Sequence, residues 1–391
     1  MNNGMNKDKT VVIGAGQAAA KCALQLRQLG YDGQIILIGD ESTSPYQRPE
    51  LSKSYLARSV SPDEVIMLTP SMASEFNIEL KLGVKASTVD VSQRFVNVHG
   101  EKIGFDKLVF ASGGRARKQA GALSLRTIAD ADRLYSTLKT EKQLSVVGGG
   151  WLGLEVAATA RSHGLAVRLY EQQERLCARS LPAEISELLL EHHKSIGVEV
   201  HLNSHLEENT SDIVCACIGI EPNDEIAREA GIEVNRGILV NERQMTSEPN
   251  IFAIGDCSRT SGQPAMENWA YADVSAERAA YAICDIPVPV SPDLWLWSKQ
   301  GELLVQMRGD YKHAQECIVR ENGSSSCHLY LNDNRLVCCI AINDPVNFGQ
   351  SRILYRSNKK LDKSALADRH VLLRSATASS NLDLADNLDT A

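Results

Sequence analysis

The sequence predicts an α/β protein built from two Rossmann-type units and a small α+β C-terminal domain. Two glycine-rich turns, at Gly14 and Gly148, carry most of this prediction, because each follows a short apolar run and precedes helical apolar spacing. The third observation is a change in the sequence pattern over residues 291–372, where short runs of alternating apolar and polar residues are typical of an α+β domain. Two such turns in one chain predict two bound dinucleotides, and hence electron transfer between two cofactors.

The first turn has the residues that a phosphate-binding turn requires. Residues 10–13 are a predicted strand and residues 18–29 a predicted helix. Gly14 permits the tight bend, Gly16 permits the backbone to approach a pyrophosphate, and Ala19 is small enough for helix–strand packing. The next strand, 35–38, leads to Asp40, 26 residues after Gly14, where a carboxylate binds a ribose hydroxyl.

The second turn repeats this order at Gly148, Gly150 and Gly153. The predicted elements are a strand at 144–147, a helix at 152–162 and a strand at 166–170. Glu171 then follows Gly148 by 23 residues, and its carboxylate would accept from both ribose hydroxyls while repelling a 2′-phosphate. The pattern therefore favours NADH over NADPH, although Arg175 lies nearby in the sequence. The alternative is that Asp40 and Glu171 only terminate their strands.

Length and composition limit the other classes of function. A chain of 391 residues with 43% hydrophobic content is long enough for two or three domains. The net charge of −8 argues against general nucleic-acid affinity. No apolar stretch approaches the roughly 20 residues of a membrane span, and no signal peptide is apparent, so we expect a cytoplasmic protein without a membrane partner.

The ten cysteines do not form a metal-binding or redox motif. No Cys-x-x-Cys pair or zinc-like spacing occurs among them, so we predict no metal site. Cys215 and Cys217 alternate along one apolar strand, which is typical of core packing.

Domain boundaries follow from the order of these patterns. A strand at 251–254 that ends in Gly255-Asp256 indicates that the chain returns to the first unit. The turn at His99-Gly100 predicts a β-hairpin whose second strand is 105–110, and the third strand of the second unit is expected at 213–218. The predicted domains are 7–114 and 237–290 for the first unit, 115–236 for the second, 291–372 for the C-terminal domain and 373–391 for a disordered tail.

Five motifs are specific enough to indicate a family. They are SPYQRPELSK at 44–53, ASGGRAR at 111–117, GLE at 153–155, IGD at 254–256 and WLWS at 295–298. With these motifs the chain resembles, over residues 8–372, the FAD-dependent ferredoxin–NAD(+) reductases that serve bacterial ring-hydroxylating dioxygenases in aromatic hydrocarbon catabolism, and some cytochrome monooxygenases. The resemblance implies a glutathione-reductase-like fold.

The resemblance also implies roles for individual residues. Lys53 and Glu155 correspond to a catalytic pair near flavin N5, in which the lysine cation stabilises the reduced, anionic ring. The residues implied to bind FAD are Gly14, Gly16, Ala19, Asp40, Arg48, Lys53, Ala86, Arg126, Asp256 and Trp269. Those implied to bind NAD are Gly148, Gly150, Gly153 and Glu171.

The implied activity is hydride transfer from NADH to FAD, followed by single-electron transfer to a [2Fe–2S] ferredoxin of the Rieske or plant type. A terminal oxygenase would be served indirectly. Lys299, Arg48, Arg308 and Lys312 are candidate basic contacts for an acidic ferredoxin, the alternative being ordinary solvated charges. Two other readings stay open: an NADH-dependent rubredoxin or nitrite-reductase-type flavoprotein, and a redox-sensing signalling flavoprotein.

Overall fold

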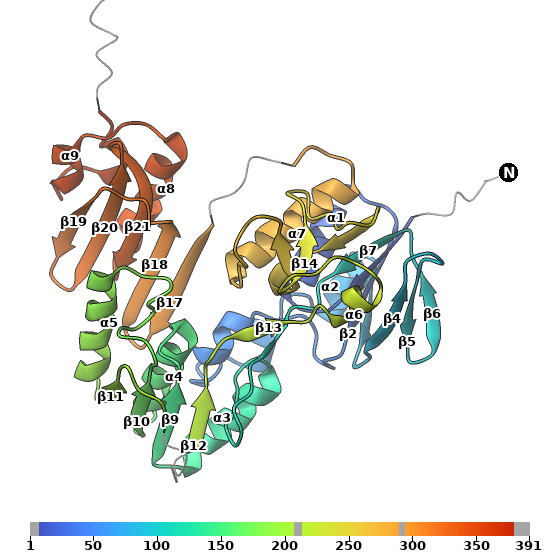
Figure 1. Ribbon diagram of the computed structural model, residues 1–391, viewed down its shortest axis with the longest axis horizontal. Helices are drawn as coiled ribbons and strands as arrows, with labels where there is room; N and C mark the ends of the chain where they lie inside the picture. Colours follow the sequence, from blue (N-terminus) through green and yellow to red (C-terminus); the bar gives the residue numbers. More distant parts are fainter. Residues whose placement is uncertain (1–7, 207–212, 289–293, 379–391) are drawn as a thin grey trace, which may run out of the picture. The chain divides into compact units, whose positions relative to one another are not determined.

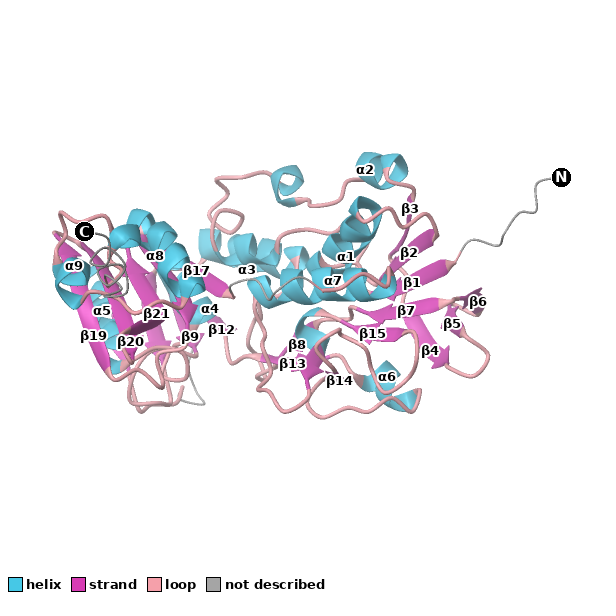
Figure 2. Cartoon of the chain, turned by 90° about the horizontal axis from the view of Figure 1, so that it is seen from above, coloured by secondary structure: helices cyan, strands magenta, loops and turns pink. Residues whose placement is uncertain are grey.

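The computed structural model describes residues 8–206, 213–288 and 294–378 (Figure 1). The chain divides into two compact units, residues 1–292 and 293–391. Helices alternate with strands in the first unit, which contains both glycine turns (Figure 2). No helix in the described part of the chain combines the length and the apolar composition needed to cross a membrane.

A five-stranded parallel sheet forms the centre of the first nucleotide-binding region. In spatial order its strands are β15 (Ile251–Ala253), β7 (Lys107–Phe110), β1 (Lys9–Ile13), β2 (Gln34–Gly39) and β3 (Ile78–Leu82). Strand β15 comes from far along the chain and pairs in parallel with β7. The chain therefore returns to this sheet after the second glycine turn, as the strand–Gly–Asp pattern predicts.

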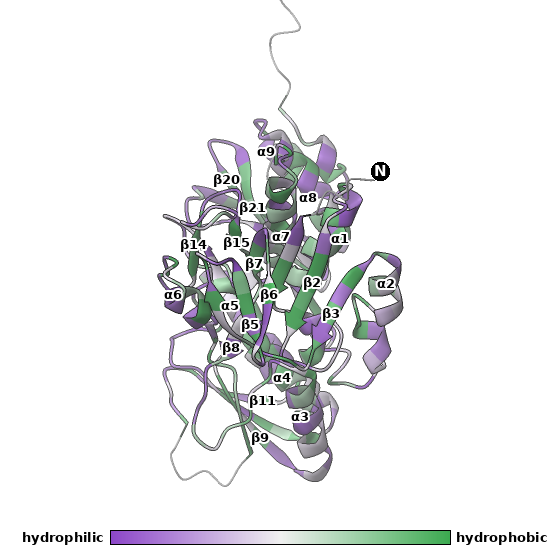
Figure 3. Ribbon diagram, turned by 90° about the vertical axis from the view of Figure 1, so that its right-hand side faces the viewer, coloured by the Kyte–Doolittle hydropathy of each residue, from purple (hydrophilic) through white to green (hydrophobic). Residues whose placement is uncertain are grey.

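Both faces of this sheet are buried, as an all-parallel sheet requires. Val12 points to the face covered by helices α1 (Gln17–Gln28) and α7 (Trp269–Ile283), which share a hydrophobic core with the short helix α2 (Pro70–Glu75). Val11 points to the opposite core. The apolar residues that fill β2 are visible in Figure 3 and are almost fully buried. The carboxyl ends of these strands remain open for a site.

A small antiparallel sheet covers the second face. It consists of β4 (Ala86–Asp90), β5 (Phe95–Val98) and β6 (Glu101–Gly104). The predicted turn at His99-Gly100 is present, since both residues have positive φ. The predicted second strand of the hairpin is wrong: β5 pairs with 101–104, because residues 107–110 are already paired on both sides by β1 and β15.

The second nucleotide-binding region has a four-stranded parallel sheet. Its strands in spatial order are β11 (Val198–His201), β10 (Ala166–Tyr170), β9 (Gln143–Val147) and β12 (Ile213–Ala216). Strand β12 is the fourth strand of the sheet along the chain and not the third, because β11 precedes it. The helices of this region are α3 (Ile128–Thr140), α4 (Trp151–Ser162) and α5 (Ala183–Ser195).

Two short ladders and several single turns complete the first unit. Strands β8 (Gly114–Ala116) and β13 (Ile220–Pro222) pair where the chain passes between the two regions. The other elements are β14 (Ile238–Val240), β16 (Ser258–Thr260), α6 (Glu225–Glu229) and the 3₁₀ turns η1 (Arg48–Ser52), η2 (Pro62–Val65) and η3 (Gly255–Cys257). The sequence-based boundary at 114 falls inside β8, and the internal domain limits stay predictions.

The second unit has the α+β composition that the sequence predicts. Its antiparallel sheet has the order β17 (Trp295–Gln300), β18 (Leu303–Gly309), β21 (Arg335–Ile342), β20 (Ser325–Asn332) and β19 (Glu316–Asn322). Helices α8 (Pro345–Ser357) and α9 (Lys363–Ala367) and the turn η4 (Leu373–Ser375) contribute to its core.

The predicted disordered tail begins too early. Leu373 and Ala376 are fully buried in the core of the second unit, and Thr377 forms a β-bridge with Leu361. Burial of these two apolar side chains outweighs the polar composition that suggested a tail from residue 373. The rest of the predicted tail, 379–391, lies outside the described residues.

Candidate active site

The first glycine turn has a backbone that only glycine can adopt without strain. Gly14 has φ +124°, and a Cβ atom at this position would lie 2.1 Å from the Ala111 carbonyl oxygen. Its N–H donates to the Ile38 carbonyl at 2.7 Å, which ties the turn to β2. Gly16 then caps α1, whose free N–H groups and dipole favour a phosphate.

The second turn repeats this geometry. Gly148 has φ +104°, and a Cβ here would lie 2.5 Å from the Cys217 carbonyl oxygen. A Cβ on Gly153 would lie 1.9 Å from the Gly148 carbonyl oxygen, so the third glycine permits α4 to pack directly on the turn. Gly150 has open space where its Cβ would be, as a position that faces a pyrophosphate requires.

A cavity of about 560 Å³ extends from the first turn to helix α4. Eight of the predicted residues line it: Gly14, Gly16, Asp40, Arg48, Arg126, Glu155, Asp256 and Trp269. Ala19 is instead fully buried beneath the turn in the core of α1, which agrees with its predicted packing role. Lys53 and Ala86 are not among the lining residues: Lys53 lies behind Glu155, and Ala86 is buried in β4. The adenine contact of Ala86 stays a prediction.

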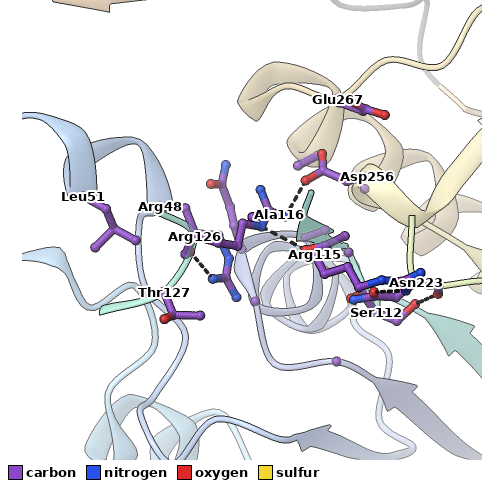
Figure 4. A pocket seen from close by; sticks show the side chains of 18 of the residues that line it. Arg48, Leu51, Ser112, Arg115, Ala116, Arg126, Thr127, Asn223, Asp256 and Glu267 are labelled. Atoms are coloured by element: carbon purple, nitrogen blue, oxygen red, sulfur yellow. Dashed lines mark hydrogen bonds and ion pairs between the residues drawn. The ribbon is translucent and has the colours of Figure 1, made fainter. Parts of the chain in front are cut away.

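Two arginines, Arg48 and Arg126, line the cavity, and each is held by hydrogen bonds (Figure 4). Arg126 pairs with Asp256 at 2.6 Å and donates through Nε to the Gly114 carbonyl at 3.0 Å. Arg48 donates to the Arg126 carbonyl at 2.7 Å. Both guanidinium groups are thus oriented before any ligand arrives, and they supply positive charge along a cavity that begins at a phosphate-binding turn.

Sequence reasoning missed the residues that orient Arg48. Glu41 accepts from Arg48 at 2.6 Å and from the Tyr46 hydroxyl at 2.6 Å, while that hydroxyl accepts from Arg48 at 2.9 Å. Burial raises the pKa of Tyr46 above its usual range, so it remains a hydrogen-bond donor. In the sequence, the position of Tyr46 two residues before Arg48 is the signal that could have indicated this contact.

The carboxylates at the end of β2 have separate surroundings. Glu41 is engaged by Tyr46 and Arg48, whereas the neighbouring Asp40 is exposed and lines the cavity. This arrangement leaves the Asp40 carboxylate exposed to the cavity, and its contact with a ribose stays a prediction. Glu267, which the sequence analysis did not select, also lines the cavity; partial desolvation and the nearby Asp256 raise its pKa.

The two residues of the predicted catalytic pair are in contact and buried, while their catalytic role stays a prediction. Lys53 Nζ lies 2.8 Å from Glu155 Oε2, and the side chains are only 9% and 6% exposed. Lys53 also donates to the Pro49 carbonyl at 3.0 Å. Because Glu155 belongs to α4, which begins at the second glycine turn, this pair joins the far end of the cavity to the second dinucleotide motif.

Glu171 lies at the second turn, as its spacing predicts. Its Oε2 accepts from the Gly149 N–H at 2.6 Å and its Oε1 from the Gln173 N–H at 2.8 Å. Arg175 is directed elsewhere: its guanidinium donates to the Leu181 and Ala178 carbonyls and to Ser186 Oγ. These contacts engage the Arg175 guanidinium within its own region, and the donor preference implied by Glu171 stays a prediction.

Comparison with known proteins now identifies the fold and its relatives. Residues 8–276 match the family model of pyridine nucleotide-disulphide oxidoreductases, and residues 295–377 match the reductase C-terminal model. The chain belongs to the pyridine nucleotide-disulphide oxidoreductase family. These matches confirm the predicted fold, with two dinucleotide-binding regions followed by a C-terminal unit.

Similar members of this family are electron-transfer components. The chain is 34% identical over 372 residues to the 3-phenylpropionate/cinnamic acid dioxygenase ferredoxin–NAD(+) reductase component of Photorhabdus laumondii, covering 87% of this chain and 94% of the relative. It is 32% identical to the biphenyl dioxygenase system ferredoxin–NAD(+) reductase component of Paraburkholderia xenovorans, covering 92% and 96%. The covalent putidaredoxin reductase–putidaredoxin complex contains a chain with a TM-score of 0.88 at 30% identity, covering 94% and 97%.

The cavity of this oxidoreductase fits the dinucleotide cofactor of its family. The ferredoxin–NAD(+) reductases of this family use FAD and NAD(H). A turn that accepts a pyrophosphate, a free carboxylate at Asp40 and oriented cations at Arg48 and Arg126 match the chemistry of FAD in a cavity of suitable size. Within the described residues no cluster of three or more potential metal ligands occurs, and none of the ten cysteines, all of which lie in this part of the chain, is in a disulfide.

Two of the candidate contacts for an acidic partner have other roles. Arg308 is buried, and its guanidinium donates to the Phe348 carbonyl at 3.0 Å and to Ser351 Oγ at 2.9 Å. Arg48 lines the cavity. The two lysines, Lys299 and Lys312, are exposed, and their contact with a partner stays a prediction.

Proposed function

We propose that this oxidoreductase is the ferredoxin–NAD(+) reductase component of a multicomponent oxygenase. It takes a hydride from NADH onto FAD and passes single electrons to a [2Fe–2S] ferredoxin, which in turn supplies the oxygenase. The observation that carries this proposal is the position of Glu155. It lines the cavity and belongs to the helix that begins at the second dinucleotide turn, so the two cofactor sites would meet at this residue.

The residues of the chain provide binding, orientation and charge, while bound FAD supplies the redox chemistry. The Gly14 turn and α1 would hold the pyrophosphate, and Asp40 would accept from the adenosine ribose. Arg126 and Asp256 would contact the central part of the cofactor, since this ion pair lines the cavity. Trp269 would contribute an apolar wall near the ring.

At the reacting end, Lys53 and Glu155 would set the electrostatics. The buried ammonium favours added negative charge on a reduced ring, and the carboxylate partly neutralises and orients it. Close approach of the two rings is the main requirement for hydride transfer, because no separate acid or base is needed.

Glu171 and Arg175 support NADH as the electron donor. The carboxylate of Glu171 is fixed at the second turn, and Arg175 is bonded to carbonyl groups of its own region. A 2′-phosphate would therefore meet an anion without a compensating guanidinium from Arg175.

The partner in this proposal is a ferredoxin of the Rieske or plant type in the cytoplasm. A rubredoxin-reducing or nitrite-reductase-type activity and a redox-sensing role are the alternatives that the same cofactor site would permit. They differ in the acceptor: the reductase must turn over with a [2Fe–2S] protein, whereas a sensor must form a long-lived NADH complex.

A direct test uses the purified full chain loaded with FAD. NADH should bleach the flavin absorbance, and a [2Fe–2S] ferredoxin should then be reduced over many turnovers, with rubredoxin as the comparison acceptor. NADPH is the comparison electron donor, and it should reduce the flavin less efficiently than NADH. Rapid flavin reduction without reduction of any ferredoxin tried would contradict the proposal, and inability to retain FAD would remove its basis.

A further inference from the structure

Ser52 lies at the end of η1 with its side chain between two groups of opposite charge. The residue is 2% exposed and lines the cavity beside Glu155, which is 5% exposed. Its hydroxyl donates to Glu155 Oε2 at 2.5 Å, the same oxygen that accepts from Lys53 Nζ at 2.8 Å. Lys53 Nζ is also 3.5 Å from Ser52 Oγ. One carboxylate oxygen thus receives a neutral and a charged donor.

Helix α4 holds Ser52 at a second point. Thr159 Oγ1 donates to the Ser52 carbonyl at 3.0 Å. Glu155 and Thr159 are four residues apart, so they occupy the same side of α4 one turn from each other. The helix that starts at the second glycine turn therefore fixes both the hydroxyl and the backbone of Ser52.

We propose that Ser52 is a positioning residue that sets how far Glu155 neutralises Lys53 at the reacting end of the cavity. Lys53 itself does not line the cavity, whereas Ser52 and Glu155 do. By donating to Glu155, the hydroxyl takes up part of the carboxylate's negative charge, so that less of this charge neutralises the ammonium. More of the positive field of Lys53 then reaches the cofactor, an effect that is strong in a buried, poorly screened site.

This inference rests on the proposed function only in requiring bound FAD and NADH. Removing the hydroxyl in Ser52→Ala takes one donor away from Glu155 Oε2 and keeps the Lys53 ammonium, so neutralisation of the cation increases. The reduced flavin loses stabilisation, and its equilibrium with NADH moves toward the oxidised form. A hydrogen bond to a charged group is worth enough for the ratio of reduced to oxidised flavin to fall about three- to tenfold.

The experiment equilibrates FAD-loaded protein anaerobically with fixed NADH/NAD(+) mixtures and measures the reduced fraction from flavin absorbance. Ser54→Ala is the matched control, because Ser54 Oγ donates to the Glu50 carboxylate in the same segment but does not line the cavity. We expect the ratio to fall in Ser52→Ala, to recover in Ser52→Thr and to remain unchanged in Ser54→Ala. The KM for NADH should stay at the wild-type value in all three.

Thr159→Val provides a second variant if Ser52→Ala fails to fold. It retains the Ser52 hydroxyl and removes only the support of the carbonyl, so a smaller fall in the same ratio is expected. An unchanged ratio in Ser52→Ala, or an equal fall in Ser54→Ala, would overturn the positioning role. Neither measurement contains ferredoxin, so an inactive ferredoxin assay with normal flavin equilibration would count against the proposed function alone.

Discussion

The two glycine turns share a sequence pattern but have different surroundings. Around the first, Arg48 and Arg126 are already oriented across a cavity, and Asp40 is exposed toward it. At the second, the acidic residue at the strand end bonds to the turn itself, since Glu171 accepts from Gly149. The glycines thus determine the backbone of each turn, whereas charged residues from later segments give the two turns different surroundings, and we expect these surroundings to select the dinucleotide.

The largest expected effect compares a strained glycine with an unstrained one. Gly14→Ala places a Cβ within 2.1 Å of the Ala111 carbonyl at a positive φ, whereas Gly150→Ala meets nothing within 4 Å. We expect Gly14→Ala to lower the free energy of unfolding by about 3 kcal/mol or more and to lose FAD. Thermal unfolding and flavin content measure this.

Gly150→Ala is the matched control for that loss. It should change stability by less than about 0.5 kcal/mol, since the conformation and space suit alanine, while raising the KM for NADH. Equal destabilisation by the two substitutions would show that backbone strain does not distinguish Gly14, the first glycine of its turn, from Gly150, the second glycine of the other turn.

The second effect concerns the preorganised cations of the first site. Arg126→Ala removes the partner of Asp256, which then faces the cavity as an unpaired carboxylate. We expect FAD to bind about 10- to 100-fold more weakly, measured by titration of the apoprotein. Arg175→Ala is the control, because that side chain serves the second region. FAD affinity unaffected by Arg126→Ala would remove this arginine from the FAD site.

Donor specificity tests the second turn in the same way. Glu171→Ala should lower kcat/KM for NADH about 10-fold and raise that for NADPH, because the anion at the ribose position is lost. The ratio of the two kcat/KM values is the measurement. If the unmodified protein uses NADPH as efficiently as NADH, Glu171 does not select the donor.

The elements that periodicity and glycine spacing specify could be predicted from the sequence. Strands β1, β2, β9 and β10 and helices α1 and α4 lie where expected, because local pattern and tertiary packing agree. The Lys53–Glu155 contact also could be predicted, but only through family resemblance, since the two residues are 102 positions apart.

The errors arise where tertiary contacts decide the outcome. The sequence pattern predicts a hairpin strand at 105–110, but most of this segment forms β7, which pairs with β1 on one side and with β15 on the other. Arg308 was expected to be a surface charge, although β18 directs it to the carbonyl of Phe348. The Glu41–Tyr46–Arg48 network was missed because no periodic pattern marks a loop whose side chains bond to each other.

The smallest expected effect is a pH dependence near the first turn. Asp273 on α7 accepts from Gln17 at 3.0 Å, and burial raises its pKa above the usual aspartate range. The folded state therefore prefers the protonated acid, so this group's stabilising contribution is complete below the pKa of the unfolded chain and is lost as pH rises through the raised value. Asp273→Asn should thus gain stability relative to wild type with increasing pH. Urea unfolding between pH 4 and pH 8 measures the difference, with Asp90→Asn as control, because hydrogen bonds from Gln93 and Ser92 lower the pKa of Asp90 and reverse the sign. The same slope for both variants would show that Asp273 is not held as a buried acid beside the first site.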